Sequence, residues 1–402
     1  MQTLLQINTV INSGSTGHIA ENIGKLAISK GWKSYIAYGR NPKETASIPI
    51  KIGVKSSILF HVLITRLFDL HGFGSYFATK SLIKKIKKIK PDIVHLHNIH
   101  GYYIHIGLLF KFLERANIPV IWTLHDCWSF TGHCSHYMAV HCTKWKSQCF
   151  KCHEKKQYPK SVFFDNSFLN YRIKRKTFTL PESKFLKIVT PSEWLSKDVK
   201  ISFLSKYESI VINNGIDLNV FRPTKNKIKE KHSIENKKIV LGVASVWSER
   251  KGLNDFIQLA ECLPENYVII LIGLSKKQIE VLPSKIIGIA RTESQTELVQ
   301  YYSAADVFFN PTYEDNFPTT NIEALACGTP VITYNTGGSP EIIDENTGYV
   351  ISAGDLSSVV KICNKLDKSV VSEMCVNRAK KYYDQNLCFE KYFNIYESMV
   401  KA

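Results

Sequence analysis

The stretch DVFFNPTYEDNFPTTNIEALACGTPVITYN, residues 306–335, carries the pattern that decides the fold. It contains an apolar run at 306–312, a helical pattern at 320–328 and a second apolar run at 330–335. Short runs rich in Val, Ile and Phe that alternate with a helix are typical of parallel β-strands buried on both faces. The stretch therefore predicts one β-α-β unit.

The same alternation extends over almost the whole chain. Strands are expected at 3–10, 33–39, 91–99, 118–126, 185–190, 237–245 and 266–274, and helices at 18–31, 106–117, 252–263 and 295–305. At 402 residues the chain is too long for one ordinary core, and turn-rich, charged sequence lies near 205–225. We therefore predict an α/β protein with two doubly wound, Rossmann-like domains.

Composition and the start of the chain favour a soluble, cytoplasmic protein. Hydrophobic residues make up 44% of the chain and charged residues 22%, which is typical of a globular protein. Residues 1–23 have no basic segment before the apolar run, so they predict a strand rather than a signal peptide. No apolar run reaches the roughly 18 residues that a membrane-spanning helix needs.

Positive charge is concentrated in the first half of the chain. Residues 1–200 contain 30 Lys and Arg against 11 Asp and Glu, whereas residues 201–402 contain 22 against 24. This asymmetry is either a solubility bias or a sign that the first half faces a polyanion or an anionic lipid surface. Six lysines surround Leu and Ile residues at 80–90, which predicts either a helix docked on an anionic bilayer or an ordinary helix with its apolar face in the core.

Two acids, Asp315 and Glu323, lie eight positions apart around the start of the expected helix. Glu323 follows Thr320 by three residues, which is the spacing of a capping box and predicts a purely structural acid. Alternatively, a helix that begins at the carboxyl edge of a parallel sheet faces the crevice where such folds bind ligands. An acid there is suited to ribose hydroxyls, and the Gly-containing loop at 335–343 supports a nucleotide crevice.

A cysteine cluster follows the expected strand at 118–126. Four cysteines have the spacing C-x7-C-x6-C-x2-C and are Cys134, Cys142, Cys149 and Cys152. In a cytosolic protein such a cluster favours a metal site over a disulfide framework, and four thiolates suit a closed structural zinc site. The alternative is a set of free, partly buried thiols.

Seven segments, in chain order, carry a resemblance to a known family: NSGSTGHIAENI, DIVHLHNIHGYY, WTLHDCWSFTGHC, TPSEWL, NNGIDLNVFRP, ERKG and EDNFPTTNIEALACGTPVI. Together they resemble the retaining glycosyltransferases of the GT-B "glycosyl transferases group 1" family, also called family 4. Within it the chain looks like the branch that acts in bacterial exopolysaccharide, capsule, O-antigen or lipopolysaccharide assembly, including enzymes for colanic acid.

The resemblance implies two Rossmann-like domains that face a central cleft. Residues 1–205 are expected to bind the acceptor and to carry a Cys-rich insertion at 127–156. Residues 206–375 are expected to bind the nucleotide sugar, and a helix at 376–402 is expected to return to the first domain.

The resemblance also implies roles in the donor site. Glu323 matches the acid that binds ribose hydroxyls, and Asp315, or Glu314 beside it, matches the acid that contacts the transferred sugar. Lys251 matches the cation that neutralises the departing diphosphate, and Arg250 is the candidate replacement for an Arg that the family has where Ser245 stands. Phe317 and Thr319 belong to the same donor-binding segment. Asp315 and Pro318 are further departures, since the family usually has Glu and often Gly there.

In the first domain, the resemblance assigns His125 to the transferred hexose and gives Asp126 an orienting role. Its Gly-rich loop, formed by Gly14, Ser15, Thr16 and Gly17, is expected to approach the phosphates and the acceptor.

The expected activity is retaining transfer of a hexose from a UDP- or GDP-sugar to a growing, lipid-linked cell-surface polysaccharide. The expected location is the inner face of the cytoplasmic membrane, as a peripheral protein. No catalytic metal is expected, and structural zinc is expected at the four cysteines. A nucleotide-sugar epimerase of the same fold is the alternative. A nucleic-acid-binding protein with a zinc knuckle is disfavoured because the basic residues lie on an α/β pattern.

Overall fold

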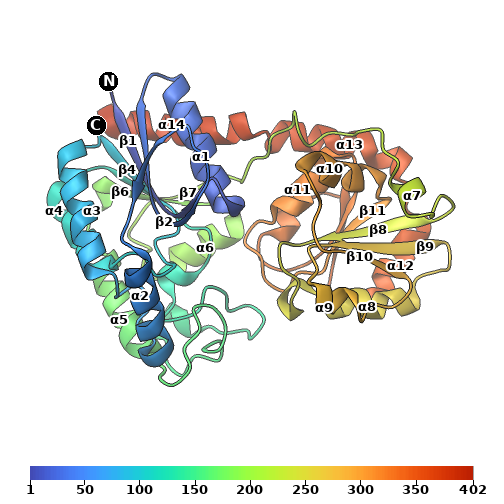
Figure 1. The fold of residues 1–402 in the computed structure, drawn as a ribbon, viewed down its shortest axis with the longest axis horizontal. Coiled ribbons are helices and arrows are strands. Elements are labelled where there is room, and N and C mark those ends of the chain that lie inside the picture. The colour runs from blue at the N-terminus through green and yellow to red at the C-terminus, as the bar shows by residue number, and fades with distance from the viewer. Residues whose placement is uncertain (402) are drawn as a thin grey trace. The chain divides into compact units, whose positions relative to one another are not determined.

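The computed structural model of the chain describes residues 1–401. The chain forms two compact units, one built from Met1–Ile212 together with the chain from Phe389 onward, and the other from Asn213–Cys388. Each unit contains one parallel sheet with helices on both of its faces (Figure 1). The predicted doubly wound α/β architecture is therefore confirmed.

The first unit contains a seven-stranded sheet in the order β3-β2-β1-β4-β5-β6-β7. Its strands are β1 (Thr3–Ile11), β2 (Lys33–Pro42), β3 (Ile48–Lys51), β4 (Ile93–Leu96), β5 (Val120–Thr123), β6 (Leu186–Thr190) and β7 (Ser209–Val211). Its helices are α1 (Gly14–Ser29), α2 (Lys55–Phe68), α3 (Tyr76–Ile89), α4 (Ile106–Ala116), α5 (Ser167–Phe178) and α6 (Glu193–Ile201). The chain order reverses between β1 and β4, which is where ligands bind in open sheets of this kind.

The second unit contains a six-stranded sheet in the order β10-β9-β8-β11-β12-β13. Its strands are β8 (Lys238–Val243), β9 (Tyr267–Ile272), β10 (Ile286–Ile289), β11 (Val307–Asn310), β12 (Val331–Tyr334) and β13 (Gly348–Ile351). Its helices are α7 (Ile228–Lys231), α8 (Leu253–Cys262), α9 (Lys276–Ile279), α10 (Gln295–Ala304), α11 (Thr319–Ala326), α12 (Leu356–Lys365) and α13 (Lys368–Tyr382). Here the reversal lies between β8 and β11.

Both faces of the second sheet are buried, as the continuous apolar runs predict. Along β9, Ile270 packs into one hydrophobic core, while its neighbours Ile269 and Leu271 pack into a second core on the opposite face. Successive side chains of a strand point to opposite faces, so a strand covered by helices on both sides has no position left for a solvent-exposed residue.

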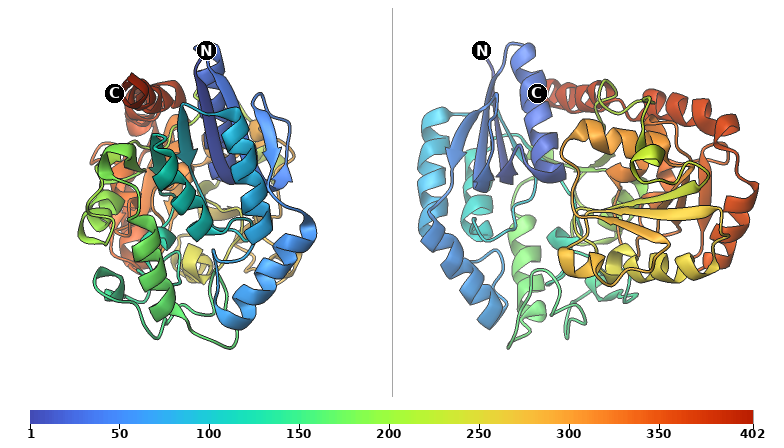
Figure 2. Two further views of the ribbon diagram at one scale, coloured as in Figure 1. Left: turned by 90° about the vertical axis from the view of Figure 1, so that its left-hand side faces the viewer. Right: turned by 45° about the vertical axis from the view of Figure 1, so that its right-hand side comes forward.

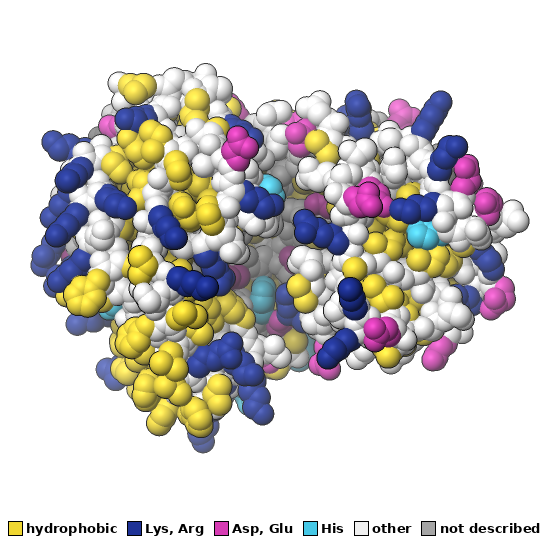
Figure 3. All heavy atoms as spheres, in the orientation of Figure 1, with side chains coloured by type: hydrophobic (Ala, Val, Ile, Leu, Met, Phe, Trp, Pro, Cys, Tyr) yellow, Lys and Arg dark blue, Asp and Glu magenta, His cyan; other side chains and the backbone are white. Residues whose placement is uncertain are grey.

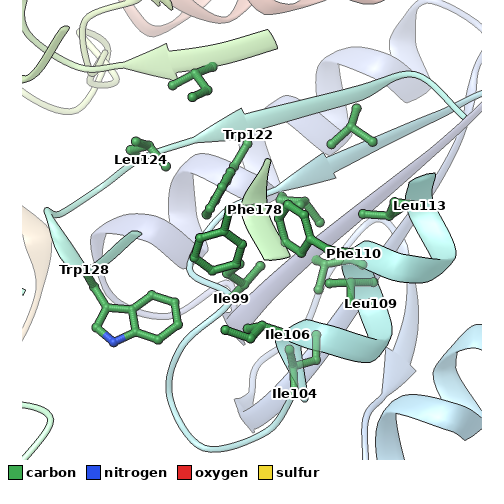
Figure 4. Close-up of a cluster of buried hydrophobic side chains, with 14 of the residues drawn as sticks. Ile99, Ile104, Ile106, Leu109, Phe110, Leu113, Trp122, Leu124, Trp128 and Phe178 are labelled. Atoms are coloured by element: carbon green, nitrogen blue, oxygen red, sulfur yellow. The ribbon is translucent and has the colours of Figure 1, made fainter. Parts of the chain in front are cut away.

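Aromatic rings fill the core between the first sheet and its helices (Figure 4). Phe178 of α5 lies 4.7 Å from Phe110 of α4 and 4.8 Å from Trp122 of β5, measured between ring centroids. Ring pairs at this spacing add to the stabilisation that burial of their area provides.

The last helix, α14 (Gln385–Lys401), joins the first unit from Phe389 onward. Phe393 packs against Trp32 with 5.1 Å between ring centroids, and Lys30 forms a 2.5 Å ion pair with Glu390. Figure 2 shows the end of this helix, in dark red and marked C, beside the first unit. The buried Tyr396 hydroxyl also lies 2.6 Å from His95 Nδ1. The end of the chain is thus part of the core of the first unit.

One local expectation was wrong, and the structure decides between two alternatives at a second place. The helix expected from residue 18 begins at Gly14, so residues 14–17 form its first turn and not a loop. On α3, Leu82 and Ile86 are buried in the core, while the lysines between them are exposed. The apolar face of α3 is therefore not a bilayer-docking face. Among the helices of residues 1–401, none combines the length and the apolar character required to cross a bilayer.

Candidate functional site

Three loops meet at the carboxyl end of the second sheet, at its reversal point. They follow β8, β11 and β12, and hydrogen bonds join them: Tyr313 N–H donates to Arg250 O at 2.9 Å, and Gly338 N–H donates to Asp315 O at 3.2 Å. Thr336 Oγ1 donates to Thr312 O at 2.6 Å. The reversal point therefore has a fixed rim formed by backbone and short polar side chains.

Gly252 fixes the loop after β8 against the loop after β11. Its φ of +75° lies in the left-handed region, and a Cβ at this position would stand 2.3 Å from Pro311 O. Only glycine allows this approach at low cost. The contact places the neighbouring Lys251 within 2.5 Å of Asp315, as an Nζ–Oδ2 ion pair.

The Lys251–Asp315 pair is partly solvent-exposed, with 22% and 21% of the side chains accessible. Ion pairs at this exposure contribute little to stability, so the pair is better suited to positioning charge than to holding the fold. Asp315 Oδ1 also accepts the Phe317 N–H at 3.3 Å, which fixes the orientation of the carboxylate.

The structure distinguishes Asp315 from Glu314, the two candidates for the acid that contacts the transferred sugar. Glu314 is only 3% exposed, and its backbone carbonyl accepts a 2.7 Å hydrogen bond from Arg250 Nη1. Arg250 therefore joins the two loops, whereas Ser245 is exposed. The geometry favours Asp315 over Glu314 as the acid that is available to a ligand.

Glu323 is not the capping residue that its spacing predicts. Helix α11 begins at Thr319 after Pro318, and no side chain caps it. The carboxylate of Glu323 accepts a 2.8 Å hydrogen bond from the hydroxyl of Tyr302 on α10. Burial raises the pKa of Glu323, while hydrogen bonds from Tyr302 and Thr319 favour its ionised form. Thr319 thus contributes its hydroxyl to this acid, and the Phe317 side chain is buried in the core.

In the first unit, His125 follows β5 and is held by a chain of hydrogen bonds. His97 Nδ1 lies 3.1 Å from His125 Nε2, and His97 Nε2 lies 3.0 Å from Gln6 Oε1. The Gln6 amide donates to Ala20 O at 2.7 Å, so its Oε1 must accept from His97 Nε2–H. His97 is neutral because burial holds its pKa well below the usual value, which leaves Nδ1 to accept from His125 Nε2–H. The chain therefore fixes the tautomer of His125.

Asp126 orients the loop that follows β5. Its carboxylate lies 2.8 Å from His100 Nε2 and accepts the Trp128 N–H at 2.9 Å. Burial opposes its ionisation, but His100 and these hydrogen bonds hold the pKa of Asp126 at about 2. Burial lowers the pKa of His125 to about 4, so its imidazole is neutral at physiological pH.

The four residues of the predicted Gly-rich loop start α1, after β1. Gly14 and Ser15 are exposed, Gly17 is buried against Val10, and Thr16 lies 3.5 Å from Asn8 Nδ2. These residues follow one of the two strands that flank the reversal point of the first sheet.

The four cysteines of the expected zinc site line one small cavity. Cys134 and Cys152 form a hydrogen bond with each other, and Cys149 Sγ accepts the Gly132 N–H at 3.2 Å. Within residues 1–401, however, no three His, Cys, Asp or Glu side chains are arranged to hold a metal ion. The expected zinc site therefore stays a prediction.

Four residues in or beside these sites were missed at the sequence level. Gln6 interrupts an apolar strand, and His95 and His97 alternate along another, so both patterns signalled polar groups on a buried face. Nothing in the sequence singled out Tyr302, because its contact with Glu323 depends on how α10 packs beside α11.

Comparison with known proteins decides the family. The model of Glycosyltransferase Family 4 matches residues 19–220, half of the chain, and the model of Glycosyl transferases group 1 matches residues 224–382. The chain belongs to glycosyltransferase family 4. It is a glycosyltransferase, and neither the epimerase nor the nucleic-acid alternative is supported.

Individual relatives agree with this assignment. The chain is 22% identical to the colanic acid biosynthesis glycosyl transferase WcaC of Escherichia coli, over 98% of this chain and 100% of that protein. It is 26% identical to an N,N′-diacetylbacillosaminyl-diphospho-undecaprenol α-1,3-N-acetylgalactosaminyltransferase of Campylobacter jejuni, over 48% of this chain and 54% of that protein. The solved structure of Anabaena HepE in complex with UDP superposes with a TM-score of 0.67 at 14% identity, over 99% of this chain and 100% of that one. The fold is thus GT-B.

The contact of Gly252 with Pro311 yields a stability prediction. We expect Gly252→Ala to destabilise the second unit by at least about 2 kcal/mol, because left-handed strain and a backbone clash add together. Gly354→Ala is the matched control, since Gly354 has a φ of +80° but open space around its missing Cβ. Denaturant unfolding measures both variants, and equal losses would show that the contact with Pro311 is not tight.

The buried histidines of the first unit predict acid sensitivity. Burial lowers the pKa of His61 and His125 to about 4 and lowers those of His71, His95 and His97 well below the usual value. Unfolded histidines bind protons below about pH 6.5, whereas His61 and His125 in the native state do so only near pH 4. The contribution of these histidines to the free energy of unfolding is therefore complete above about pH 6.5 and is lost as the pH falls toward 4.

Hydrogen exchange at neutral pH and near pH 5 measures this effect separately in each unit. The second unit contains His232 alone of the 13 histidines, so it is the internal control. We expect protection to fall more in the first unit, and an equal loss in both units would contradict the prediction.

Proposed function

We propose that the protein transfers a hexose, with retention of configuration, from a UDP- or GDP-sugar to a lipid-linked saccharide during assembly of a cell-surface polysaccharide. The observation that carries the proposal is the convergence of Lys251, Asp315 and the Gly337–Gly338 loop at the reversal point of the second sheet. A cation beside backbone N–H groups suits a diphosphate, and a fixed carboxylate suits sugar hydroxyls.

Lys251 stabilises the diphosphate as it leaves. The bond between the anomeric carbon and the diphosphate oxygen breaks, and its electron pair passes to the diphosphate. A fixed cation at this position lowers the energy of the transition state more than that of the bound donor, because the negative charge grows along the reaction. In the resting protein Asp315 holds Lys251 in place, and the donor takes over part of this interaction.

Glu323 binds the ribose, and Asp315 binds the hexose. The hydrogen bonds from Tyr302 and Thr319 favour the carboxylate form of Glu323, which accepts hydroxyl hydrogens. Neutral His125, whose Nε2–H donates to His97, accepts a hydrogen bond from a hexose hydroxyl through Nδ1 and places no positive charge beside the developing oxocarbenium ion. The first unit otherwise supplies the acceptor site.

Retention follows from attack on the face that the diphosphate leaves. The acceptor hydroxyl forms the new bond to the anomeric carbon, and an oxygen of the departing diphosphate takes its proton. This mechanism requires neither a separate protein base nor a catalytic metal.

The relatives support the choice of donor and acceptor. The HepE structure contains UDP, and the Campylobacter relative is named for an acceptor on diphospho-undecaprenol. WcaC, similar over its whole length, is named for colanic acid biosynthesis. GDP-sugars remain the second donor class, O-antigen and lipopolysaccharide remain further pathways of the same kind, and a peripheral position on the cytoplasmic face of the membrane follows from a lipid-linked acceptor.

Nucleotide binding tests the donor site. We expect UDP or GDP to raise the melting temperature of the purified protein and ADP to do so less. Glu323→Gln should weaken binding of the ribonucleotide by roughly tenfold and leave binding of the 2′-deoxy analogue nearly unchanged, because only the former loses a hydroxyl contact. Lys251→Met should weaken both, and Lys277→Met, at an exposed lysine of α9, is the control.

Absence of stabilisation by any nucleoside diphosphate would contradict the donor site. With a competent acceptor, the anomeric configuration of the product, measured by NMR, tests retention. Release of nucleoside diphosphate that depends on acceptor separates transfer from epimerisation.

We also propose structural zinc at the cysteine cluster. Its support is the chemistry of the donors: four thiols line one cavity, together with His133. Asp69 Oδ1 lies 2.5 Å from His133 Nδ1, and within residues 1–401 the buried Nε2 of His133 has no hydrogen-bond partner. A histidine held by a carboxylate in this way is typical of zinc ligands. His133 is thus a candidate ligand beside the cysteines.

Elemental analysis tests this proposal. We expect about one zinc per chain in the purified protein. The double variant Cys149→Ser with Cys152→Ser should lose it, whereas Cys262→Ser, at an exposed cysteine of the second unit, should retain it. A zinc-free protein with unchanged nucleotide binding and stability would exclude zinc.

A further inference from the structure

Helix α2 is amphipathic in the opposite sense to an ordinary surface helix. Its buried residues are His61 and Thr65, whereas Leu59, Phe60 and Leu63 are 52–59% exposed. A helix on a globular protein normally turns its apolar side to the core. This reversal leaves a row of large apolar side chains in solvent.

The buried polar side chains of α2 have specific hydrogen-bond partners. His61 Nδ1 lies 3.0 Å from Ser75 Oγ, and its Nε2 accepts the N–H groups of Gly72 and Gly74 at 3.1 and 3.2 Å. Thr65 Oγ1 donates to His61 O at 2.8 Å. These bonds satisfy the buried polar groups, so rotating α2 to bury its apolar row would leave them unpaired, at considerable cost.

A second chain segment extends the apolar row. Phe163 and Phe164 are 68% and 55% exposed, and the Phe164 ring stacks on Phe68 at the end of α2 with 5.7 Å between centroids. Val162 N–H donates to Arg66 O at 2.8 Å, and Asn166 Nδ2 donates to Phe68 O at 2.7 Å. Two segments about a hundred residues apart in sequence thus form one apolar face, made by Leu59, Phe60, Leu63, Phe68, Phe163 and Phe164.

The surroundings of this apolar face are cationic. Residues 54–68 contain no Asp or Glu, and residues 150–176 contain eight Lys and Arg, of which Lys174 is buried, against two acids. Lys155 Nζ donates to Phe163 O at 3.3 Å, which places a cation next to the most exposed ring. Figure 3 shows apolar side chains gathered, with basic ones around them, at the lower end of the left-hand unit, where Figure 1 places α2 and α5.

We propose that the apolar face inserts into the headgroup region of an anionic lipid bilayer. Exposed aromatic and aliphatic side chains supply the apolar area, and the surrounding Lys and Arg complement the negative surface. A soluble protein partner or a second copy would be expected to offer acids to these cations, whereas a bilayer offers both anionic headgroups and acyl chains. This inference deepens the proposed function, since it brings the first unit to the membrane that holds a lipid-linked acceptor.

Insertion of apolar side chains and purely electrostatic binding respond differently to salt. The exposed lysines of α3 attract the same surface, but screening at about 0.5 M salt removes most of that attraction and leaves the apolar contribution. The position of the bound protein is therefore set by α2 and the segment at 162–166.

Co-sedimentation of the full chain with vesicles, without donor or acceptor, tests the proposal. We expect binding to phosphatidylcholine vesicles that contain phosphatidylglycerol, weaker binding without it, and binding that partly persists at high salt. Phe60→Ser with Phe163→Ser should lower the affinity roughly tenfold or more, because burying one phenylalanine is worth at least that much. Ile201→Ser, on α6, removes another large apolar side chain that is 52% exposed and should change nothing.

Three results would overturn the proposal: no binding of the wild-type protein to anionic vesicles, equal binding of the double variant, or a dimer in solution that the double variant dissociates. The last result would assign the apolar face to a second copy. Nucleotide stabilisation of the same double variant should equal that of the wild type, so failure of the membrane proposal and failure of the donor site are distinguishable.

Discussion

Burial of both sheet faces is the constraint on which the rest of this structure depends. When helices cover a parallel sheet on both sides, the strands must be apolar throughout, and polar groups are left to the loops at the strand ends. The reversal of strand order then opens a gap between neighbouring loops. In the second unit this is where Lys251, Asp315 and the loop at Gly338 meet, so the candidate site lies where the packing leaves a gap between loops.

The first unit places polar groups inside its core and satisfies them in chains. Gln6, His97 and His125 form one chain, while His95 connects Thr123 with Tyr396 of the last helix. Such networks stabilise one arrangement because each member determines the proton position of the next. The last helix takes part in them, because the Tyr396 hydroxyl of α14 bonds to His95 of β4.

Helix α2 shows the opposite balance between burial and exposure. Its polar residues are committed to the interior by hydrogen bonds to the turn at 72–75, and its apolar residues face outward. In a soluble monomer this arrangement has no stability benefit. The proposed insertion into a bilayer accounts for this arrangement, because the outward side chains would then be buried.

The sequence by itself determined the α/β class, the two sheets and the family, because apolar periodicity and ordered motifs are local properties of the chain. It also located Lys251, Asp315, Glu323 and His125 as candidates. Only the tertiary structure decided that Glu323 bonds to Tyr302 instead of capping its helix, and that Asp315 rather than Glu314 is accessible. It also showed that the lysine-rich α3 buries its apolar face while α2 exposes its own. These outcomes depend on contacts between residues far apart in sequence. A local sequence pattern carries no information about the energies of such contacts.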